Sequence, residues 1–339
     1  MNSIDARGDV KVSKIGIGFI GCGGIHNNHA KALADNPDAY IACAMDVNED
    51  AVKKHQGNYG TECGTTRLDE LLANDAVQAV VVCTPTGLHP EHAIAAAQAG
   101  KHVLCEKPMA LTVAEAERMA QACADAGVVL QIAFVRHFCN EWLKLREIIQ
   151  SGAIGRPVVW RSVSASGGPA SPWFFSKKLG GGPFIDGAVH NYDFARFTFG
   201  DATGVCANLR TMRDDSDAWD TGTAIVDFTA GDQLIMCWSW GLPKSETRIS
   251  AGSAHDILGP GGAITFTGEA LKVTTPAGEE LVSFEPDGGL EWFKKQMAHF
   301  IGCVQTGSQP ETGGREGIEA TRIAEAILNI GDQPAVVKL

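Results

Sequence analysis

Three polar residues have the types and positions expected of acid–base chemistry. Lys107 lies two residues after the end of the apolar segment 102–105, and Asp186 and His190 lie four residues apart in a segment with helical character. Pro108 favours an extended conformation at Lys107, so the ammonium can project across the end of a strand. A carboxylate one helical turn before a histidine raises the basicity of the imidazole and orients it, as a general base requires. The alternatives are a solvated Lys-Pro turn and an ordinary ion pair on a helix surface.

A glycine cluster follows the apolar run 15–20 and offers two registers for a dinucleotide-binding turn. Gly16, Gly18 and Gly21 match G-x-G-x-x-G in full, whereas the register that starts at Gly21 has a histidine in the last place. We choose the second register because Gly16 and Gly18 fall inside the apolar strand. The first register would also begin its helix on residues 22–24, where each glycine lowers helix stability by about 1 kcal/mol.

In the chosen register the turn would bind the pyrophosphate of a dinucleotide. Gly21 makes the turn, Gly23 lets the phosphates approach the backbone, and a helix that begins near Ile25 directs free N–H groups at them. His26 stands where a third glycine normally permits close packing of helix and strand, so the packing there is expected to differ. The alternative is a glycine-rich hairpin that binds no ligand.

Asp46 is the candidate ligand of the adenosine ribose. It ends the apolar segment 40–45 and lies 25 residues after Gly21, where a carboxylate binds the ribose hydroxyls of NAD. This carboxylate would repel the 2′-phosphate of NADP, and no arginine follows within residues 47–50. NAD is therefore the expected cofactor and NADP is disfavoured. The alternative is that Asp46 caps the next helix.

These residues need a scaffold, and the first part of the chain predicts a doubly wound parallel sheet. Apolar strand patterns alternate with helical patterns up to Phe134. Ligands of such a sheet bind at the carboxyl ends of its strands, where Thr84-Pro85 and Lys107 fall. We assign residues 1–136 to a Rossmann-type NAD-binding domain. The expected strands include 79–83, 102–105 and 128–134.

Beyond Phe134 the pattern changes to short strands joined by Gly, Pro and Asp turns, which predicts a mainly antiparallel sheet. One helix, residues 184–197, interrupts these strands and carries Asp186 and His190. Two further helices, 290–306 and 316–330, follow the strands. We assign residues 137–339 to a second α/β domain for substrate binding and oligomerisation, so the fold class is α/β.

Composition narrows the function. A net charge of −12 disfavours a nucleic-acid partner, and no run approaches the ~18 apolar residues of a membrane span. The first nine residues lack the apolar core of a signal peptide, so a cytoplasmic protein is expected. The 10 cysteines include no C-x-x-C pair. They are expected to be small core residues in a reducing compartment, with no disulfide framework and no metal site.

Taken in order, the motifs resemble those of the Gfo/Idh/MocA oxidoreductases, a family named after glucose-fructose oxidoreductase and inositol dehydrogenase. The resemblance covers residues 15–330. It implies a Rossmann domain, a second domain whose large open sheet commonly forms homodimers or homotetramers, and a cleft between the domains for NAD and a polyhydroxylated small molecule. The motifs are Gly21-Cys-Gly-Gly-Ile25 with His29, Thr84-Pro85-Thr86 with His89, Glu106-Lys107-Pro108, and residues 180–193.

The resemblance also implies roles for individual residues. Lys107 would hydrogen-bond the reacting hydroxyl and the nicotinamide ribose, His190 would exchange the hydroxyl proton, and Asp186 would bind a neighbouring hydroxyl. Arg136 and Trp173 match positions near the substrate. The implied cofactor-binding residues are Gly21, Gly23, Gly24, Ile25, His26, Asp46, Thr84, Pro85, His89, Glu106 and Lys107.

The function expected from this resemblance is NAD-dependent hydride transfer to or from a hydroxyl or keto carbon of a sugar, an inositol or a sugar derivative. Two alternatives remain open. One is a glycosidase that uses transient oxidation by NAD, and the other is a non-catalytic dinucleotide sensor. The presence of Lys107, Asp186 and His190 argues against the sensor, which needs only the binding groups of the first domain.

Overall fold

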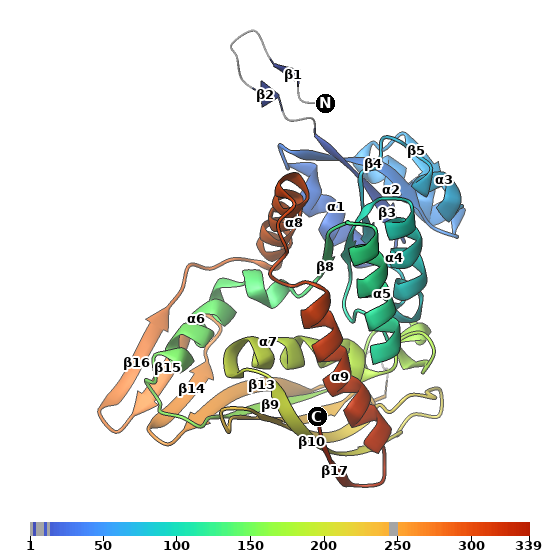
Figure 1. Cartoon of the computed structure of the whole chain (residues 1–339). Coiled ribbons are helices and arrows are strands. Elements are labelled where there is room, and N and C mark those ends of the chain that lie inside the picture. Colours follow the sequence, from blue (N-terminus) through green and yellow to red (C-terminus); the bar gives the residue numbers. More distant parts are fainter. Residues whose placement is uncertain (1–2, 5–9, 12–13, 244–249) are drawn as a thin grey trace.

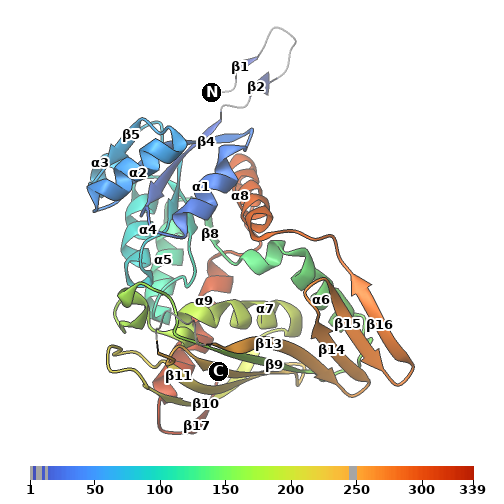
Figure 2. The ribbon, with the colours of Figure 1, turned by 180° about the vertical axis from the view of Figure 1, so that it is seen from behind.

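The structure is a computed structural model that describes residues 3–4, 10–11, 14–243 and 250–339. It consists of two sheets with helices packed on them (Figures 1 and 2). A short antiparallel pair, β1 (Ser3–Ile4) and β2 (Val10–Lys11), precedes the first sheet. Most of the segment on which the signal-peptide expectation rests lies outside the described residues. No helix within the described ranges is long and apolar enough to cross a membrane.

The first sheet has six parallel strands among the described residues, in the order β5-β4-β3-β6-β7-β8. This doubly wound order confirms the predicted Rossmann-type fold. The chain reverses its direction of growth between β3 and β6, so a ligand crevice is expected where these two strands end. The strands are β3 (Ile15–Ile20), β4 (Ala39–Met45), β5 (Cys63–Thr65), β6 (Ala79–Val82), β7 (His102–Cys105) and β8 (Leu130–Ile132). The helices that connect them are α1 (His26–Ala34), α2 (Glu49–Tyr59), α3 (Leu68–Leu72), α4 (His89–Gln98) and α5 (Val113–Asp125).

The two glycines of β3 allow close packing of the strand against its neighbours. This observation bears on the choice between the two glycine registers. Both Gly16 and Gly18 lie inside β3, and a Cβ on Gly16 would lie 1.8 Å from the carbonyl oxygen of Ala76. Gly21 follows the strand with φ +94° and makes the turn. Of the two registers, the one that starts at Gly21 therefore has its glycines in the turn after the strand.

We expect Gly16→Ala to destabilise the protein by about 1–3 kcal/mol, the usual cost of overpacking a core. Gly57→Ala is the matched control, because Gly57 is exposed in α2 and a Cβ there meets nothing within 4 Å. Alanine in a helix interior is favoured over glycine by about 1 kcal/mol, so the control should be neutral or stabilising. Urea unfolding measures both changes, and an unaltered free energy of unfolding for Gly16→Ala would contradict the packing argument.

The second sheet has nine strands among the described residues, in the order β16-β15-β14-β13-β9-β12-β11-β10-β17. Of these neighbours, β9 and β12 pair in parallel and the others are antiparallel, which confirms the expected mainly antiparallel sheet. The strands are β9 (Val159–Ser166), β10 (Ala202–Arg210), β11 (Thr221–Phe228), β12 (Gln233–Ser239), β13 (Ser250–Gly259), β14 (Gly262–Phe266), β15 (Ala270–Thr275), β16 (Gly278–Ser283) and β17 (Ala335–Lys338).

Helices cover one face of this sheet and connect it to the first. Both α6 (Asn140–Gln150) and α7 (Val189–Phe199) lie over the nine-stranded sheet, and α9 (Gly314–Ile330) packs against α5 and α7 (Figure 1). In contrast, α8 (Gly289–Thr306) packs beside α1, and its Phe293, Met297 and Phe300 join the core under the first sheet. The interval expected to form the second domain therefore contains a helix that covers the first sheet.

The expectation of cysteines without disulfide bonds is wrong for one pair. Cys43 of β4 and Cys63 of β5 form a disulfide with a Cα–Cα distance of 4.6 Å. The two residues are register partners on adjacent parallel strands, so the pleat directs both side chains to the same face. A search for C-x-x-C spacing does not detect this pair, because the two cysteines are 20 residues apart in the chain.

Candidate active site

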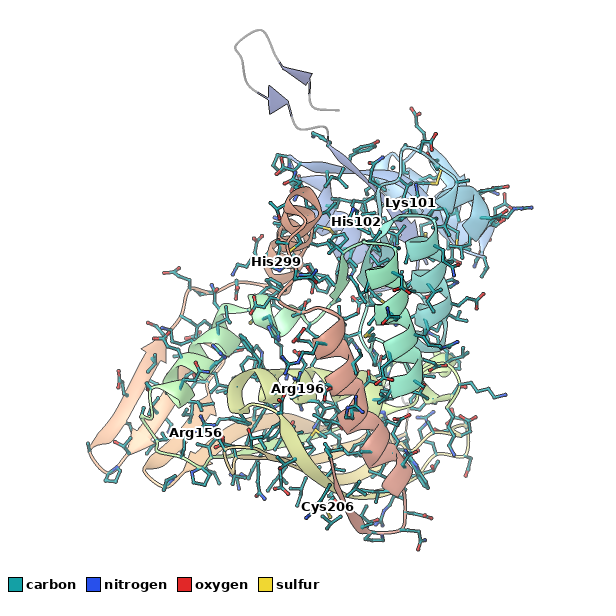
Figure 3. All side chains as sticks on the ribbon, viewed as in Figure 1. Lys101, His102, Arg156, Arg196, Cys206 and His299 are labelled. Carbon is teal, nitrogen blue, oxygen red and sulfur yellow. A yellow bond between two sulfur atoms is a disulfide. The ribbon has the colours of Figure 1, made fainter. Side chains whose placement is uncertain are left out.

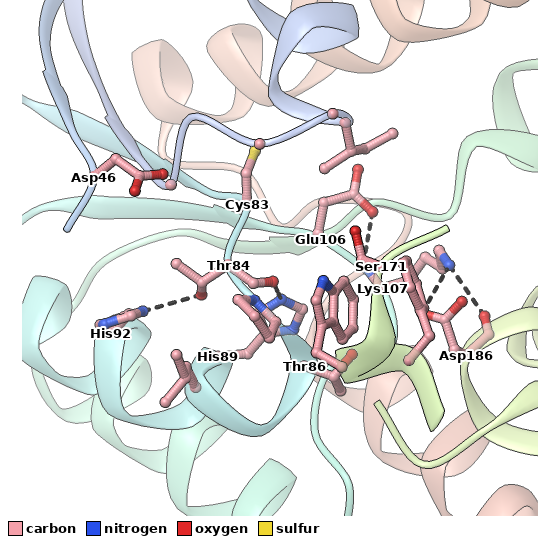
Figure 4. A pocket seen from close by; sticks show the side chains of 18 of the residues that line it. Asp46, Cys83, Thr84, Thr86, His89, His92, Glu106, Lys107, Ser171 and Asp186 are labelled. Atoms are coloured by element: carbon pink, nitrogen blue, oxygen red, sulfur yellow. Dashed lines mark hydrogen bonds and ion pairs between the residues drawn. The ribbon is translucent and has the colours of Figure 1, made fainter. Parts of the chain in front are cut away.

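A cavity of about 570 Å³ opens where β3, β6 and β7 end, as expected for this sheet (Figure 4). It lies between the glycine turn, the ends of these strands and segments of the second half of the chain. Twelve of the predicted residues line it, namely Gly21, Gly23, Gly24, Ile25, Asp46, Thr84, Pro85, His89, Glu106, Lys107, Trp173 and Asp186. Three others, His26, Arg136 and His190, are not in its wall.

The glycine turn leaves room for a ligand. A Cβ on Gly21 would lie 3.0 Å from the carbonyl group of Cys83, whereas a Cβ on Gly23 or Gly24 would meet nothing within 4 Å. Ile25 precedes α1 without a side-chain cap, and the first turn of α1 carries no acidic residue. Free N–H groups and open space in front of them fit the pyrophosphate of a dinucleotide.

Asp46 is held at the edge of the cavity by two backbone N–H groups. Its Oδ2 accepts a hydrogen bond from the N–H of Cys22 at 2.7 Å, and its Oδ1 accepts one from Asn48 at 2.9 Å. The cap of α2 is Asn48, whose side chain accepts from the N–H of Asp50. The alternative of Asp46 as the helix cap is therefore wrong, and its carboxylate remains directed at the cavity.

His26 lies behind the turn, outside the cavity wall. It is 2% exposed, its ring packs edge-on against Phe19, and its Nε2 lies 2.6 Å from Nδ1 of His55. Burial lowers the pKa of His26, and it lowers the pKa of His55 to about 4. Both imidazoles are thus neutral. The geometry offers His26 no direct contact with a ligand in the cavity, in contrast to its expected place among the cofactor-binding residues.

Histidines of α4 fix the turn after β6. The ring of His89 lies between two backbone carbonyls, 2.8 Å from that of Thr84 and 2.7 Å from that of Pro108, so it joins the ends of β6 and β7. His92, which sequence reasoning missed, also lines the cavity, with Nδ1 3.0 Å from the hydroxyl of Thr84 (Figure 4). His92 lies one helical turn after His89, so helical spacing could have predicted that it faces the same cavity.

Lys107 and Asp186 meet in the cavity wall, although they come from different halves of the chain. The Lys107 ammonium donates to the backbone carbonyl of Asp186 at 3.0 Å and pairs with its Oδ1 at 3.4 Å (Figure 4). Burial raises the pKa of Asp186, and the charge of Lys107 opposes that rise. Glu106 accepts the N–H of Lys107 and lies 2.7 Å from Nε2 of His29, which fixes the strand end.

The expected continuous helix over 184–197 is wrong. A π-helical turn (Pro183–Gly187) precedes α7, and in it the N–H of Ala188 donates to the carbonyl of Pro183, five residues earlier. One extra residue in a turn rotates the following helix by about 100°. Asp186 therefore lies in the π-helical turn and His190 in the first turn of α7, and within the described residues no hydrogen bond joins them.

Asp193 lies three residues after His190 in α7, and its carboxylate is engaged away from the cavity. Its Oδ2 pairs with Nε2 of buried His137 at 2.9 Å, and Glu311 lies on the other side of that ring. The two carboxylates raise the pKa of His137 to about 9, against the effect of burial. This ion-paired group ties α7 to the segment before α6 and takes no part in the cavity.

His190 lies in the first turn of α7 and is partly buried. Burial first, and then the charges of Lys107 and Arg136, lower its pKa well below the ordinary value, so the imidazole is neutral. Within the described residues, its buried Nδ1 has no hydrogen-bond partner. Arg136 donates to Asn191 at 2.5 Å and lies over the ring of Trp142.

An aromatic pair forms the opposite wall. Trp173 stacks on Phe174 with ring centroids 3.6 Å apart, and both line the cavity with Ser171. Phe174 was not among the predicted residues, although it directly follows Trp173 in the sequence. The other lining residues that sequence reasoning missed are Met45, Val47, Cys83, Thr86, Leu88, Pro169 and Ser171.

Comparisons with known proteins agree with this geometry. Residues 15–134 match "Oxidoreductase family, NAD-binding Rossmann fold", and residues 142–265 match "GFO/IDH/MocA C-terminal domain". Myo-inositol 2-dehydrogenase of Thermotoga maritima is 30% identical over 337 residues, which cover 95% of this chain and 98% of that protein. 1,5-Anhydro-D-fructose reductase of Ensifer adhaerens is 39% identical over 270 residues, covering 77% and 80% of the two chains.

A solved structure shows the same arrangement. The WlbA dehydrogenase of Bordetella pertussis, crystallised with NADH and UDP-GlcNAcA, superposes with a TM-score of 0.80 and is 27% identical. The match covers 96% of this chain and 99% of the other. The likeness in fold therefore extends over both sheets.

Proposed function

Because the chain belongs to the Gfo/Idh/MocA oxidoreductase family, whose relatives act on CH–OH groups, we propose that it oxidises or reduces one carbon of a polyhydroxylated substrate with NAD. The substrate class is a sugar, an inositol or a sugar derivative. This choice is supported by the activities for which the relatives are named, which include those of myo-inositol 2-dehydrogenase and 1,5-anhydro-D-fructose reductase.

One observation carries the proposal: Lys107 and Asp186 lie in the same cavity as the glycine turn and Asp46. Residues of the turn and Asp46 would hold NAD, because Gly23 and Gly24 leave open space and the carboxylate of Asp46 faces it. Bound NAD supplies an acceptor for the hydride of a CH–OH group. A polyol carries neighbouring hydroxyls, so the Lys107 ammonium and the Asp186 carboxylate can each form a hydrogen bond with one of them.

Each catalytic group then has a stated task. The Lys107 ammonium donates a hydrogen bond to the reacting oxygen, and Asp186, which already anchors Lys107, accepts one from a neighbouring hydroxyl. His190 is neutral and thus able to take the hydroxyl proton as the carbonyl forms, or to return it in the reverse direction. Trp173 and Arg136 complete the proposed substrate-binding set.

The test is absorbance at the NADH band with purified protein, NAD and a panel of inositols, hexoses and sugar acids, together with NADH oxidation by 1,5-anhydrofructose. Turnover with one substrate class supports the proposal. Cleavage of nitrophenyl glycosides without net NADH would favour the glycosidase instead. Absence of any NAD-induced thermal shift at millimolar NAD would contradict the cofactor assignment.

We expect Asp46→Ala to raise the KM for NAD by about 10- to 100-fold, because hydrogen bonds to a charged group contribute about 1.5–3 kcal/mol. The KM for NADP should rise less or fall, since the repulsion of the 2′-phosphate is removed as well. Initial rates with both cofactors measure the ratio. Asp50→Ala, on the first turn of α2 and outside the cavity, is the control. Equal changes for NAD and NADP would contradict the ribose assignment.

We place the protein in the cytoplasm. We also propose that it forms a homodimer or homotetramer through the outer face of the nine-stranded sheet. Val163 is 45% exposed on that face, and its register partner Cys237 is also exposed. Apolar side chains exposed on an open sheet are typical of an interface between subunits. Light scattering on the eluted protein measures the mass, and a monomer at micromolar concentration would contradict this part of the proposal.

A further inference from the structure

Behind the glycine turn, outside the catalytic cavity, three potential metal ligands from separate segments converge. They are Cys22 of the turn, His26 at the start of α1 and His55 of α2, and their ligand atoms lie within 4.8 Å of one another. We propose that these three residues form a binding site for one Zn²⁺ ion. This inference is independent of the substrate and of the proposed reaction.

In each ring, the nitrogen that faces away from the other ring lies near an oxygen atom, as in known metal sites. His26 Nδ1 lies 3.3 Å from the carbonyl oxygen of Gly23, and His55 Nε2 lies 3.0 Å from the hydroxyl of Thr61. A histidine that binds a metal usually donates its other N–H to such an oxygen, which fixes the tautomer and the ring plane. The remaining nitrogens, His26 Nε2 and His55 Nδ1, face each other at 2.6 Å.

Without a metal, one proton must lie between the facing nitrogens. Since the Gly23 carbonyl can only accept, His26 carries its proton on Nδ1, and His55 donates from Nδ1 to His26 Nε2. The Thr61 hydroxyl then donates to His55 Nε2. When the ion binds, the proton of His55 moves to Nε2 and is donated to Thr61, so both lone pairs become available and each histidine stays neutral.

The third ligand decides which metal fits. One thiolate and two neutral imidazoles are a typical donor set for Zn²⁺. The Cys22 thiol gives its proton to solvent when it binds the ion, and water completes the coordination because Cys22 is only partly buried. Two imidazole nitrogens at about 2.0–2.1 Å from a tetrahedral ion are roughly 3.3 Å apart, so the rings must separate by about 0.7 Å.

Such an ion would tie α2 to the continuous segment formed by the glycine turn and the start of α1. Cys22 also donates its backbone N–H to Asp46. A ligand that binds the folded state alone raises the unfolding midpoint, and the rise grows with the logarithm of the free ligand concentration relative to Kd. One equivalent of Zn²⁺ is therefore expected to raise the thermal midpoint of the metal-free protein.

The test uses the full chain, freed of metal by a chelator and kept reduced with a non-thiol reductant. Titration with Co²⁺ should give a thiolate-to-cobalt band in the near ultraviolet together with the visible bands of tetrahedral Co²⁺. Both should saturate at one equivalent and disappear on addition of one equivalent of Zn²⁺. Cys22→Ser should abolish the ultraviolet band, and His55→Gln should weaken Zn²⁺ binding at least tenfold, measured by competition with a chromogenic chelator.

The chain offers a matched control in α8. Cys303 Sγ lies 3.7 Å from Nε2 of His299, which Figure 3 labels, but this pair belongs to no group of three ligands in the described part of the chain. Cys303→Ser should therefore keep the full cobalt spectrum. Loss of the spectrum in Cys303→Ser, its retention in Cys22→Ser, or no tetrahedral band at one equivalent would each overturn the proposal. Circular dichroism checks that every variant is folded.

Discussion

Lys107→Met should lower kcat by about 10²- to 10⁴-fold, the range that a positioned proton-transfer or charge-stabilising group commonly contributes. The methionine keeps the apolar stem but removes the hydrogen-bond donor from the reacting oxygen. It also removes the charge that opposes the raised pKa of Asp186, so that carboxyl becomes easier to protonate and binds hydroxyls less well. Steady-state rates measure the loss once a substrate is known.

The NAD-induced thermal shift should survive in this variant, because the glycine turn and Asp46 are unchanged. Lys178→Met is the matched control, since Lys178 is exposed and outside the cavity wall. Loss of NAD binding in Lys107→Met would mean that the residue serves the cofactor alone. An unchanged kcat would contradict its catalytic role.

His190→Gln should also lower kcat by about 10²- to 10⁴-fold, because glutamine forms hydrogen bonds but takes no proton at neutral pH. The pH profile is the sharper readout. His190 acts as a base only when neutral, and its pKa lies well below the ordinary value of 6.5. The wild-type rate should therefore hold as the pH falls through 6.5 and decline only below the lowered pKa.

Arg136→Gln tests the cause of that shift. Arg136 is one of the two cations that lower the pKa of His190, so its removal raises that pKa and moves the acid limb of the profile to higher pH. His102→Gln, at the start of β7 and outside the cavity, should leave the limb in place. A limb that is the same in wild type and in Arg136→Gln would contradict the assignment of His190 as the base.

Local pattern was enough to predict the first sheet and most of its ligand groups. Strand ends and turn glycines are set by residues close in sequence, which is why Gly21, Asp46, Thr84 and Lys107 were found at the cavity. Trp173 was also predicted correctly as a residue near the cavity, because its place just before the glycine run 180–182 matches a position of the family. Its neighbour Phe174 and the helical His92 follow the same local logic, but no motif marks them.

The failures have other causes, and two of them depend on residues that are distant in the chain. The π-helical turn before α7 cannot be seen in helical periodicity, since one extra residue changes the register without changing the composition. His26 could be recognised as a departure from the glycine pattern, but its partner His55 lies a whole strand away. The Cys43–Cys63 bond likewise needs the strand pairing to be known.

The position of α8 has a consequence for how the chain folds as it is synthesised. The first sheet is complete at β8, yet one of its apolar faces is covered only in part, by α1, until Phe293, Met297 and Phe300 have left the ribosome. A nascent chain that ends between these points carries an exposed, aggregation-prone surface. The two halves therefore form one cooperative unit, and a fragment of residues 1–136 is expected to need the later helix, or a chaperone, to remain in solution.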